Sequence, residues 1–228
     1  MMLSMKRFVQ AGFIAALLAG GSAMAANTAA TTNGKPAPTT VDTSGPSQLI
    51  ESSANILLAD IDKNRDTYRK DPTGLYKTVG ETLLPNFDTA YAAQLVLGPH
   101  WRNASADQRK RFVDAFYNSL LYTYGDAMVD FTANRLKVFP TKVGDADARA
   151  TVRSEITRSN GTKVAVNYSM RRVEGAWKAW DVVIDGISYV KSYREDYGAE
   201  VQQKGLDAVI ARLEAKAAAA KSGKDKAS

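Results

Sequence analysis

The hydrophobic residues of this 228-residue chain change their spacing near residue 135. Before that point they recur every three or four positions, which is the period of amphipathic helices that pack on a core. Prolines and small polar residues suited to helix starts divide this part into four segments. We expect helices that begin at Ser47, at Pro72, at Phe87 and at a capping box of Ser105 and Gln108.

After residue 135 apolar and polar residues alternate, which predicts strands with one buried face. Val152, Ser154 and Ile156 form one such run, and a second run extends from Val164 to Met170. The runs are short and follow one another closely along the chain. The sequence therefore predicts a meander of antiparallel strands.

Two short segments predict the turns of this sheet. Asn160-Gly161 predicts a two-residue hairpin of type I′, because both residues tolerate positive φ angles. Glu174-Gly175 predicts a second turn, after which Trp180, Val182 and Ile184 continue the apolar face. An apolar stripe between residues 197 and 213 predicts one closing helix. Helices followed by antiparallel strands indicate an α+β fold, with helices against one face of a twisted sheet.

The N-terminus has the features of a cleavable signal peptide, residues 1–25. Lys6 and Arg7 precede an uncharged stretch, and Ala23-Met24-Ala25 is a small-x-small cleavage site. The apolar stretch is shorter than the roughly 18 residues that a membrane-spanning helix needs. Residues 26–46 contain few large apolar side chains, which predicts a disordered linker. We therefore expect a protein of the periplasm, with a folded domain at 47–215 and a basic flexible tail at 216–228.

The net charge of +6 belongs mostly to the ends of the chain. Lys6 and Arg7 leave with the signal peptide, and the tail holds a further +3, so the folded domain keeps +1. Proteins that bind nucleic acid concentrate positive charge on a folded face, so we expect no nucleic-acid partner. The chain has no cysteine, which excludes disulfides and thiol catalysis.

Residues suited to catalysis or metal binding are few. His100 is the single histidine, which leaves little for a multi-histidine metal site or a Ser-His-Asp system. Asp181 and Asp185 are four apart in an expected strand, so a regular pleat would point both to one face, where paired carboxylates can serve acid–base chemistry. More often one such residue caps the following turn and the other faces water. We expect no catalytic residue, no metal and no cofactor.

Several segments resemble one protein family. The stretch from Trp177 to Arg194 combines an aromatic-rich strand with Asp181, an apolar run and Gly186-Ile187-Ser188 ahead of a helix. Leu84-Pro85-Asn86-Phe87-Asp88 and a block at 205–213 follow the same order as in that family, so the similarity covers about 47–213. These blocks resemble the toluene-tolerance or MlaC family, the periplasmic phospholipid-binding components of the Mla lipid-asymmetry system.

The resemblance implies a curved antiparallel sheet of the NTF2-like kind, a helical portion packed against it, and an apolar pocket between them. A phospholipid would be the cargo, with its acyl chains in the pocket and its head group near water. The residues that we expect to contact the acyl chains are Phe87, Leu95, Phe116, Leu120 and Tyr124 on helices, and Val152, Val164, Val166, Tyr168, Val182 and Ile184 on strands.

The resemblance also implies partners. A diacyl glycerophospholipid would pass between an outer-membrane lipoprotein–porin complex and an inner-membrane ABC transporter, which maintains the lipid asymmetry of the outer membrane. Two other functions fit an apolar cavity in such a fold. One is an NTF2-like isomerase or dehydratase with a buried carboxylate or histidine, and the other is a carrier or chaperone for the acyl chains of lipoproteins.

Overall fold

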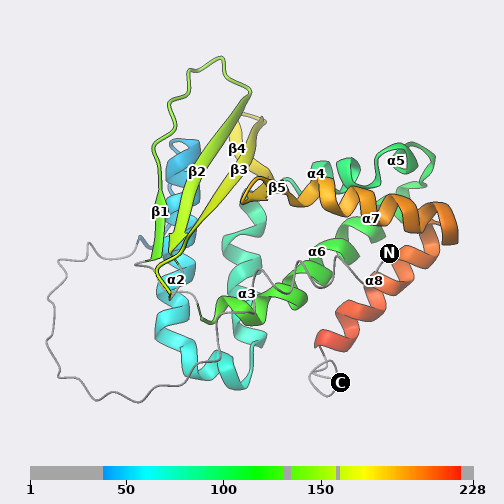
Figure 1. Ribbon diagram of the computed structural model, residues 1–228, viewed down its shortest axis with the longest axis horizontal. Coiled ribbons are helices and arrows are strands. Elements are labelled where there is room, and N and C mark those ends of the chain that lie inside the picture. Colours follow the sequence, from blue (N-terminus) through cyan, green and yellow to red (C-terminus); the bar gives the residue numbers. More distant parts are fainter. Residues whose placement is uncertain (1–37, 131–134, 158–159, 222–228) are drawn as a thin grey trace, which may run out of the picture.

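The computed structural model describes residues 38–130, 135–157 and 160–221, so the expected signal peptide lies outside the described residues. Helices come first, an antiparallel sheet follows and further helices close the chain, which confirms the α+β class (Figure 1). The elements are α2 (Pro46–Lys70), α3 (Thr73–Thr82), the 3-10 helix η1 (Leu84–Asn86), α4 (Thr89–Leu97), α5 (Pro99–Asn103), α6 (Ala106–Met128), β1 (Leu136–Val138), β2 (Arg149–Thr157), β3 (Lys163–Val173), β4 (Ala176–Ile184), β5 (Ile187–Ser188), α7 (Tyr189–Lys204) and α8 (Leu206–Lys221).

The described sheet is the expected antiparallel meander, with its strands in the order β1-β2-β3-β4-β5. Residues that lie opposite each other on neighbouring strands share a face of the sheet. Val152, Tyr168 and Val182 form one such row. Leu49 and Ile50 of α2 pack in the same buried cluster as Val152. The apolar face of the sheet is therefore the face that α2 covers.

A bulge interrupts β4 where it pairs with β3. Ser169 pairs with Asp181, whereas Met170 pairs with Ala179, so Trp180 is the extra residue on β4. A bulge breaks the alternation of side chains between the two faces. The prediction that Trp180 continues the apolar face of its strand is therefore wrong.

Positive φ angles mark two tight turns in the sheet. Glu174 and Gly175 have φ angles of 50° and 84°, and the flanking Val173 and Ala176 pair with each other. Two consecutive positive φ angles are the type I′ geometry that suits the twist of a hairpin. This confirms the predicted turn at Glu174-Gly175. Asp185-Gly186 has the same geometry, with φ angles of 48° and 84°, between β4 and β5.

The predicted two-residue turn at Asn160-Gly161 is wrong. Thr157 pairs with Lys163, a register that does not close on a two-residue turn at Asn160-Gly161. Gly161 has a φ of 81°, but Asn160 does not have the positive φ that a type I′ turn also requires. Asn160 Oδ1 instead accepts a hydrogen bond from the Thr162 N–H at 3.0 Å. This Asx turn closes a longer loop through a side chain rather than through two left-handed residues.

The start of α6 is the predicted capping box. Ser105 Oγ accepts from the Gln108 N–H at 3.1 Å, and Gln108 Oε1 accepts from the Ser105 N–H at 3.0 Å. Each side chain satisfies a backbone donor that the helix leaves open.

The prediction of one closing helix is wrong, because Gly205 divides it into α7 and α8. Gly205 has φ 82° and ψ 159°. This region of backbone space is open essentially to glycine alone. The apolar spacing continues across the break, so periodicity alone does not detect it.

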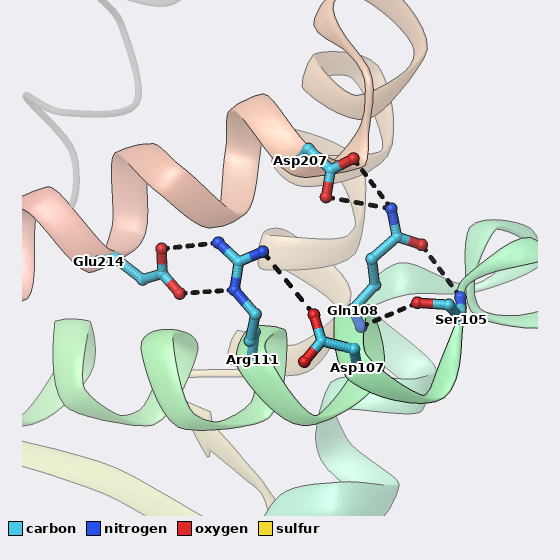
Figure 2. A network of polar contacts seen from close by, with 6 residues as sticks. All are labelled: Ser105, Asp107, Gln108, Arg111, Asp207 and Glu214. Atoms are coloured by element: carbon cyan, nitrogen blue, oxygen red, sulfur yellow. Dashed lines mark hydrogen bonds and ion pairs between the residues drawn. The ribbon is translucent and has the colours of Figure 1, made fainter.

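Polar side chains hold α8 along α6 (Figure 2). Arg111 on α6 donates two hydrogen bonds to the Glu214 carboxylate on α8, at 3.0 and 2.9 Å. The hydrogen bond from Arg111 keeps the pKa of Glu214 below its ordinary value. Gln108 donates to both Asp207 oxygens at 3.1 Å, so the residue that caps α6 also contacts the start of α8.

The folded structure extends into both of the segments expected to be a linker and a tail. In the segment expected to be a linker, Val41 packs against the core and the Asp42 N–H donates to Ser52 Oγ at 2.8 Å. At the other end α8 continues past residue 215 to Lys221. Alanine, the strongest helix former, occupies 217–220 and favours this extension.

Within residues 38–130, 135–157 and 160–221, the buried apolar residues form three separate clusters rather than the single contiguous core usual in a domain. We call them the helical cluster, the sheet cluster and the α2–α3 cluster. Figure 1 shows α6 running from beside α3 toward α7 and α8, so this helix passes from one part of the core to another. The buried members are Ala93, Val96, Leu97, Phe112, Ala115, Phe116, Tyr197, Val201, Val209, Ile210 and Leu213 in the helical cluster, Leu49, Ile50, Val152, Met170, Trp177 and Ala179 in the sheet cluster, and Leu57, Ile61, Tyr68, Leu75, Val79 and Val129 in the α2–α3 cluster.

Candidate functional site

The strand residues expected to contact acyl chains share one face of the sheet. Val166 lies opposite Ile184, one row along from Val152, Tyr168 and Val182. Val164 is two residues before Val166 and so points to the same side. Three of these residues are buried, namely Val152, Val164 and Val166. The other three are half-buried, namely Tyr168, Val182 and Ile184.

Three of the expected helical residues gather around Tyr193 of α7. The Phe116 ring meets the Tyr193 ring edge to face, with centroids 5.3 Å apart. Tyr124 Oη lies 3.0 Å from Tyr193 Oη. Leu120 packs against the helical cluster to which Phe116 belongs. The sequence prediction of these α6 residues did not include their partner on α7.

The two remaining helical residues lie apart from this group. Phe87 packs on the sheet cluster and forms a parallel bridge with Ala179. Leu95 is half-buried on α4. The expected acyl contacts are thus divided between the sheet cluster and the helical cluster, and their contact with lipid stays a prediction.

Tyrosine side chains are prominent in the helical part of the protein. Tyr189, Tyr193 and Tyr197 recur every four residues on α7, which is the sequence signal that could have identified them. Burial raises the pKa of Tyr197 to about 12 and also raises the pKa of Tyr193. Burial raises the pKa of Tyr117 on α6 to about 12 as well. The Tyr193 and Tyr197 rings are stacked with their centroids 5.5 Å apart, so these two side chains pack against each other.

Asp181 connects the sheet to α7. It is 3% exposed, and its carboxylate accepts from Ser188 Oγ at 2.6 Å and from the Val190 N–H at 3.0 Å. Asp185 lies beyond the end of β4, in the turn, where it accepts from the Ala165 N–H at 3.2 Å. The two carboxylates therefore do not share a face of one strand. Asp185 closes the turn, as the alternative interpretation expected, but Asp181 is buried and positions a helix rather than facing water.

A pocket of about 350 Å³ lies on the polar face of β2 and β3, opposite the apolar face that α2 covers. Arg149 and Thr151 line it, and they alternate along β2 with residues of the apolar face. The other lining residues are Ala150, Ser169, Met170 and Trp180. Sequence reasoning missed this pocket, because it depends on strand register and on the bulge that displaces Trp180.

Metal-site and membrane-span signals are both absent from the part of the chain that the structure describes. No three potential ligands among His, Cys, Asp and Glu gather into a group that could hold a metal ion. No described helix is long and apolar enough to cross a membrane.

Comparisons with known proteins agree with the resemblance seen in the sequence. The family model described as MlaC protein matches residues 51–215. The toluene tolerance protein ttg2D of Pseudomonas putida is 28% identical over 169 residues, which cover 74% of this chain and 78% of that protein. The intermembrane phospholipid transport system binding protein MlaC of Haemophilus influenzae is 25% identical over 179 residues, which cover 77% of this chain and 84% of that protein.

A solved structure shares the fold. It is a phospholipid-binding protein from Ralstonia solanacearum, determined in complex with a phospholipid. The TM-score is 0.67 at 22% identity, and the match covers 75% of this chain and 96% of that one. The likeness confirms the expected fold class, a curved antiparallel sheet with a helical portion.

Proposed function

Because the chain belongs to the MlaC protein family, we propose that it is a periplasmic phospholipid carrier. It takes up a diacyl glycerophospholipid and moves it between an outer-membrane lipoprotein–porin complex and an inner-membrane ABC transporter, which maintains outer-membrane asymmetry. The name of the Haemophilus influenzae relative, an intermembrane phospholipid transport system binding protein, supports this role. The phospholipid bound to the Ralstonia solanacearum neighbour supports the choice of cargo.

The energetics of lipid exposure define what such a carrier must provide. Moving a methylene group from apolar surroundings into water costs about 0.8 kcal/mol, so two acyl chains with roughly 30 methylenes cost on the order of 24 kcal/mol. A carrier must cover nearly all of this surface and still release it. Its binding surface must therefore be apolar and able to open.

The division of the core is the observation that carries the proposal. The helical cluster and the sheet cluster are each packed within themselves. An acyl chain placed between them can separate the two without creating a cavity in either. Asp181, which links β4 to α7 through Ser188 and Val190, supplies a polar connection that does not depend on apolar packing across this boundary.

Half-buried side chains on the sheet and on the helices suit the task. Tyr168, Val182 and Ile184 on the sheet and Leu95, Leu120 and Tyr124 on the helices are half-buried in the described structure. Half-buried apolar groups gain from further coverage, by about 25 cal/mol per Å² of surface removed from water. Lipid uptake can therefore be favourable on both sides.

Native purification followed by solvent extraction and mass spectrometry tests the proposal. We expect diacyl phospholipid in the extract of the mature protein, and uptake of phospholipid from vesicles by protein that has been stripped of lipid. Acyl chains bound as lipoprotein would identify the alternative carrier instead. A protein that carries no lipid and takes up none would contradict the proposal.

Val182 and Val183 provide a matched pair of variants for this experiment. They are neighbours on β4, both are half-buried, and they point to opposite faces of the sheet. Val182→Asn places a polar group on the apolar face and should reduce the bound lipid several-fold. Val183→Asn should retain lipid. Circular dichroism of both variants checks that they fold, and equal lipid content in the two folded variants would argue against this face.

A further inference from the structure

Four of the six residues that line the pocket on the polar face of the sheet carry side-chain hydrogen-bond donors. Arg149 lies on β2, and Thr151 lies opposite Ser169 of β3. Trp180 enters from the bulge of β4. The volume of about 350 Å³ falls within the range of about 300–1,000 Å³ typical of small-molecule sites. No acidic residue is among those that line it.

Several of these donors have no partner within the described residues. Trp180 Nε1 is buried and makes no hydrogen bond there. The side-chain hydroxyls of Thr151, which is exposed, and of Ser169, which is half-buried, also have no hydrogen-bond partner among the described residues. Of these three donors only Trp180 Nε1 is buried, and a buried donor without an acceptor is unfavourable and can mark a place where a further molecule binds.

Arg149 provides positive charge that no carboxylate neutralises. Within the described residues no carboxylate oxygen lies within 4.0 Å of it, and its Nη2 donates to Tyr91 Oη at 3.4 Å. Arg171, directly across on β3, differs, because its Nε lies 3.1 Å from Asp88 Oδ2. Arg149 therefore remains available to an anion.

Tyr91 of α4 keeps these groups in place. The guanidinium of Arg171 lies 4.2 Å from the centre of its ring, and the Trp180 ring meets it edge to face at 5.6 Å. Two acids lie on this face: Asp88 is paired with Arg171, and Asp181 lies opposite Ser169. The Asp181 carboxylate already accepts from Ser188 and Val190, and it does not line the pocket.

We propose that this pocket binds a phosphate group. A guanidinium matches the oxygens of phosphate through paired hydrogen bonds, and the hydroxyls of Thr151 and Ser169 can serve the other oxygens of a tetrahedral anion. The pocket lies on the face of the sheet opposite the expected strand contacts, so phosphate binding there does not require those contacts.

Titration with inorganic phosphate, followed through the indole N–H signals in a proton–nitrogen correlation spectrum, tests the proposal. The chain has three tryptophans, and Trp180→Phe assigns the signal of Trp180. We expect that signal to shift and saturate with phosphate but not with sodium chloride at equal ionic strength. Absence of a saturable shift would overturn the proposal.

Arg149→Gln and Arg153→Gln form the matched pair. Both arginines are exposed on the same face of β2 and the substitutions remove the same charge, but Arg153 does not line the pocket. Arg149→Gln should weaken phosphate binding by at least about tenfold, since it removes charge-assisted hydrogen bonds. Arg153→Gln should change binding less than about twofold. Equal weakening by both would show general charge attraction and overturn the site.

Two sources of the phosphate group are distinguished by a second measurement. Binding to vesicles of phosphatidylglycerol and of phosphatidylcholine is compared for both variants. Loss of phosphatidylglycerol binding in Arg149→Gln alone identifies a lipid head group, whereas unchanged vesicle binding with weaker inorganic phosphate binding identifies a free phosphate compound. Either result supports the site. Arg149→Gln should leave the co-purified phospholipid unchanged, so the pocket and the carrier function can fail separately.

Discussion

At the scale of single residues, buried polar groups fix the geometry of this protein. Asp181 is 3% exposed and accepts hydrogen bonds from Ser188 and Val190, at the point where β5 leads into α7. Hydrogen bonds to a charged group are worth about 1.5–3 kcal/mol each. A single side chain thus sets where the helical part begins relative to the sheet.

Substitution of Asp181 tests this role. Asp181→Asn keeps the size of the side chain but replaces one acceptor oxygen by a donor, so we expect a loss of about 2 kcal/mol in the free energy of unfolding. Urea denaturation measures it. Asp185→Asn is the control and should change stability by less than about 0.5 kcal/mol, because asparagine also tolerates the positive φ of that turn. A neutral Asp181→Asn variant would contradict the assigned role.

The buried phenols predict a loss of stability at high pH. Burial raises the pKa of Tyr117 and of Tyr197 from 10.0 to about 12 in the folded protein. Above pH 10 the unfolded chain releases these protons while the folded chain keeps them, so stability should fall as the pH rises from about 10 to about 12.

Phenolate absorbance and denaturation at several pH values measure the effect. Tyr197→Phe cannot ionise at this position, so its stability should depend less on pH across the same window. An unchanged pH dependence in this variant would show that Tyr197 does not contribute.

At the scale of elements, glycine conformation decides how the chain closes. Gly205 has φ 82° and ψ 159°, and its N–H donates to the Val201 carbonyl at 2.8 Å, which ends α7. A side chain there would meet no atom within 4 Å, so backbone strain alone requires glycine. The resulting break lets α8 fold back along α6, where Arg111 and Glu214 pair.

Alanine substitutions at two glycines test whether backbone strain, rather than lack of room for a side chain, makes glycine necessary. Gly205→Ala should destabilise the protein by about 1–3 kcal/mol, because alanine is strained at this φ and ψ. Gly80 lies within α3 and also has no atom within 4 Å of an added Cβ. Gly80→Ala should stabilise by about 0.5–1 kcal/mol, because alanine favours the helix. Thermal and urea denaturation of both variants check this opposition of signs, and changes of the same sign would contradict it.

At the scale of the whole molecule, the core is divided. The helical cluster and the sheet cluster each bury their own apolar residues, and the expected acyl contacts belong partly to each. A carrier has to exchange protein–protein contacts for protein–lipid contacts at low cost. Two cores that are complete in themselves permit that exchange, whereas one continuous core would have to be broken.

Lipid removal should therefore lower stability without unfolding the protein. A ligand at 100 times its dissociation constant stabilises the folded state by about 2.7 kcal/mol. For a domain of this size that corresponds to a rise in melting temperature of about 5–10 °C. Calorimetry of stripped and reloaded protein measures the difference, and Val182→Asn should show a smaller one. Equal melting temperatures would argue against a bound lipid.

Local signals in the sequence determined much of this protein. The capping box of Ser105 and Gln108 and the turn at Glu174-Gly175 depend on neighbouring residues, and both were predicted correctly. The alternation of Val152, Val164 and their neighbours placed the expected strand contacts on one face, because side chains in a strand alternate with a period of two.

The tertiary structure alone decided the rest. Register between β3 and β4 creates the bulge at Trp180, and the donors of the polar pocket meet because Arg149, Ser169 and Trp180 come from three different strands. Gly205 breaks a helix across which the apolar spacing continues unchanged. These features arise from contacts between distant segments, and such contacts leave no periodic pattern in the sequence of either segment. The sequence by itself therefore determined most of the elements, the faces of most strand residues and the family, whereas packing between elements decided how the core divides and where the donors gather.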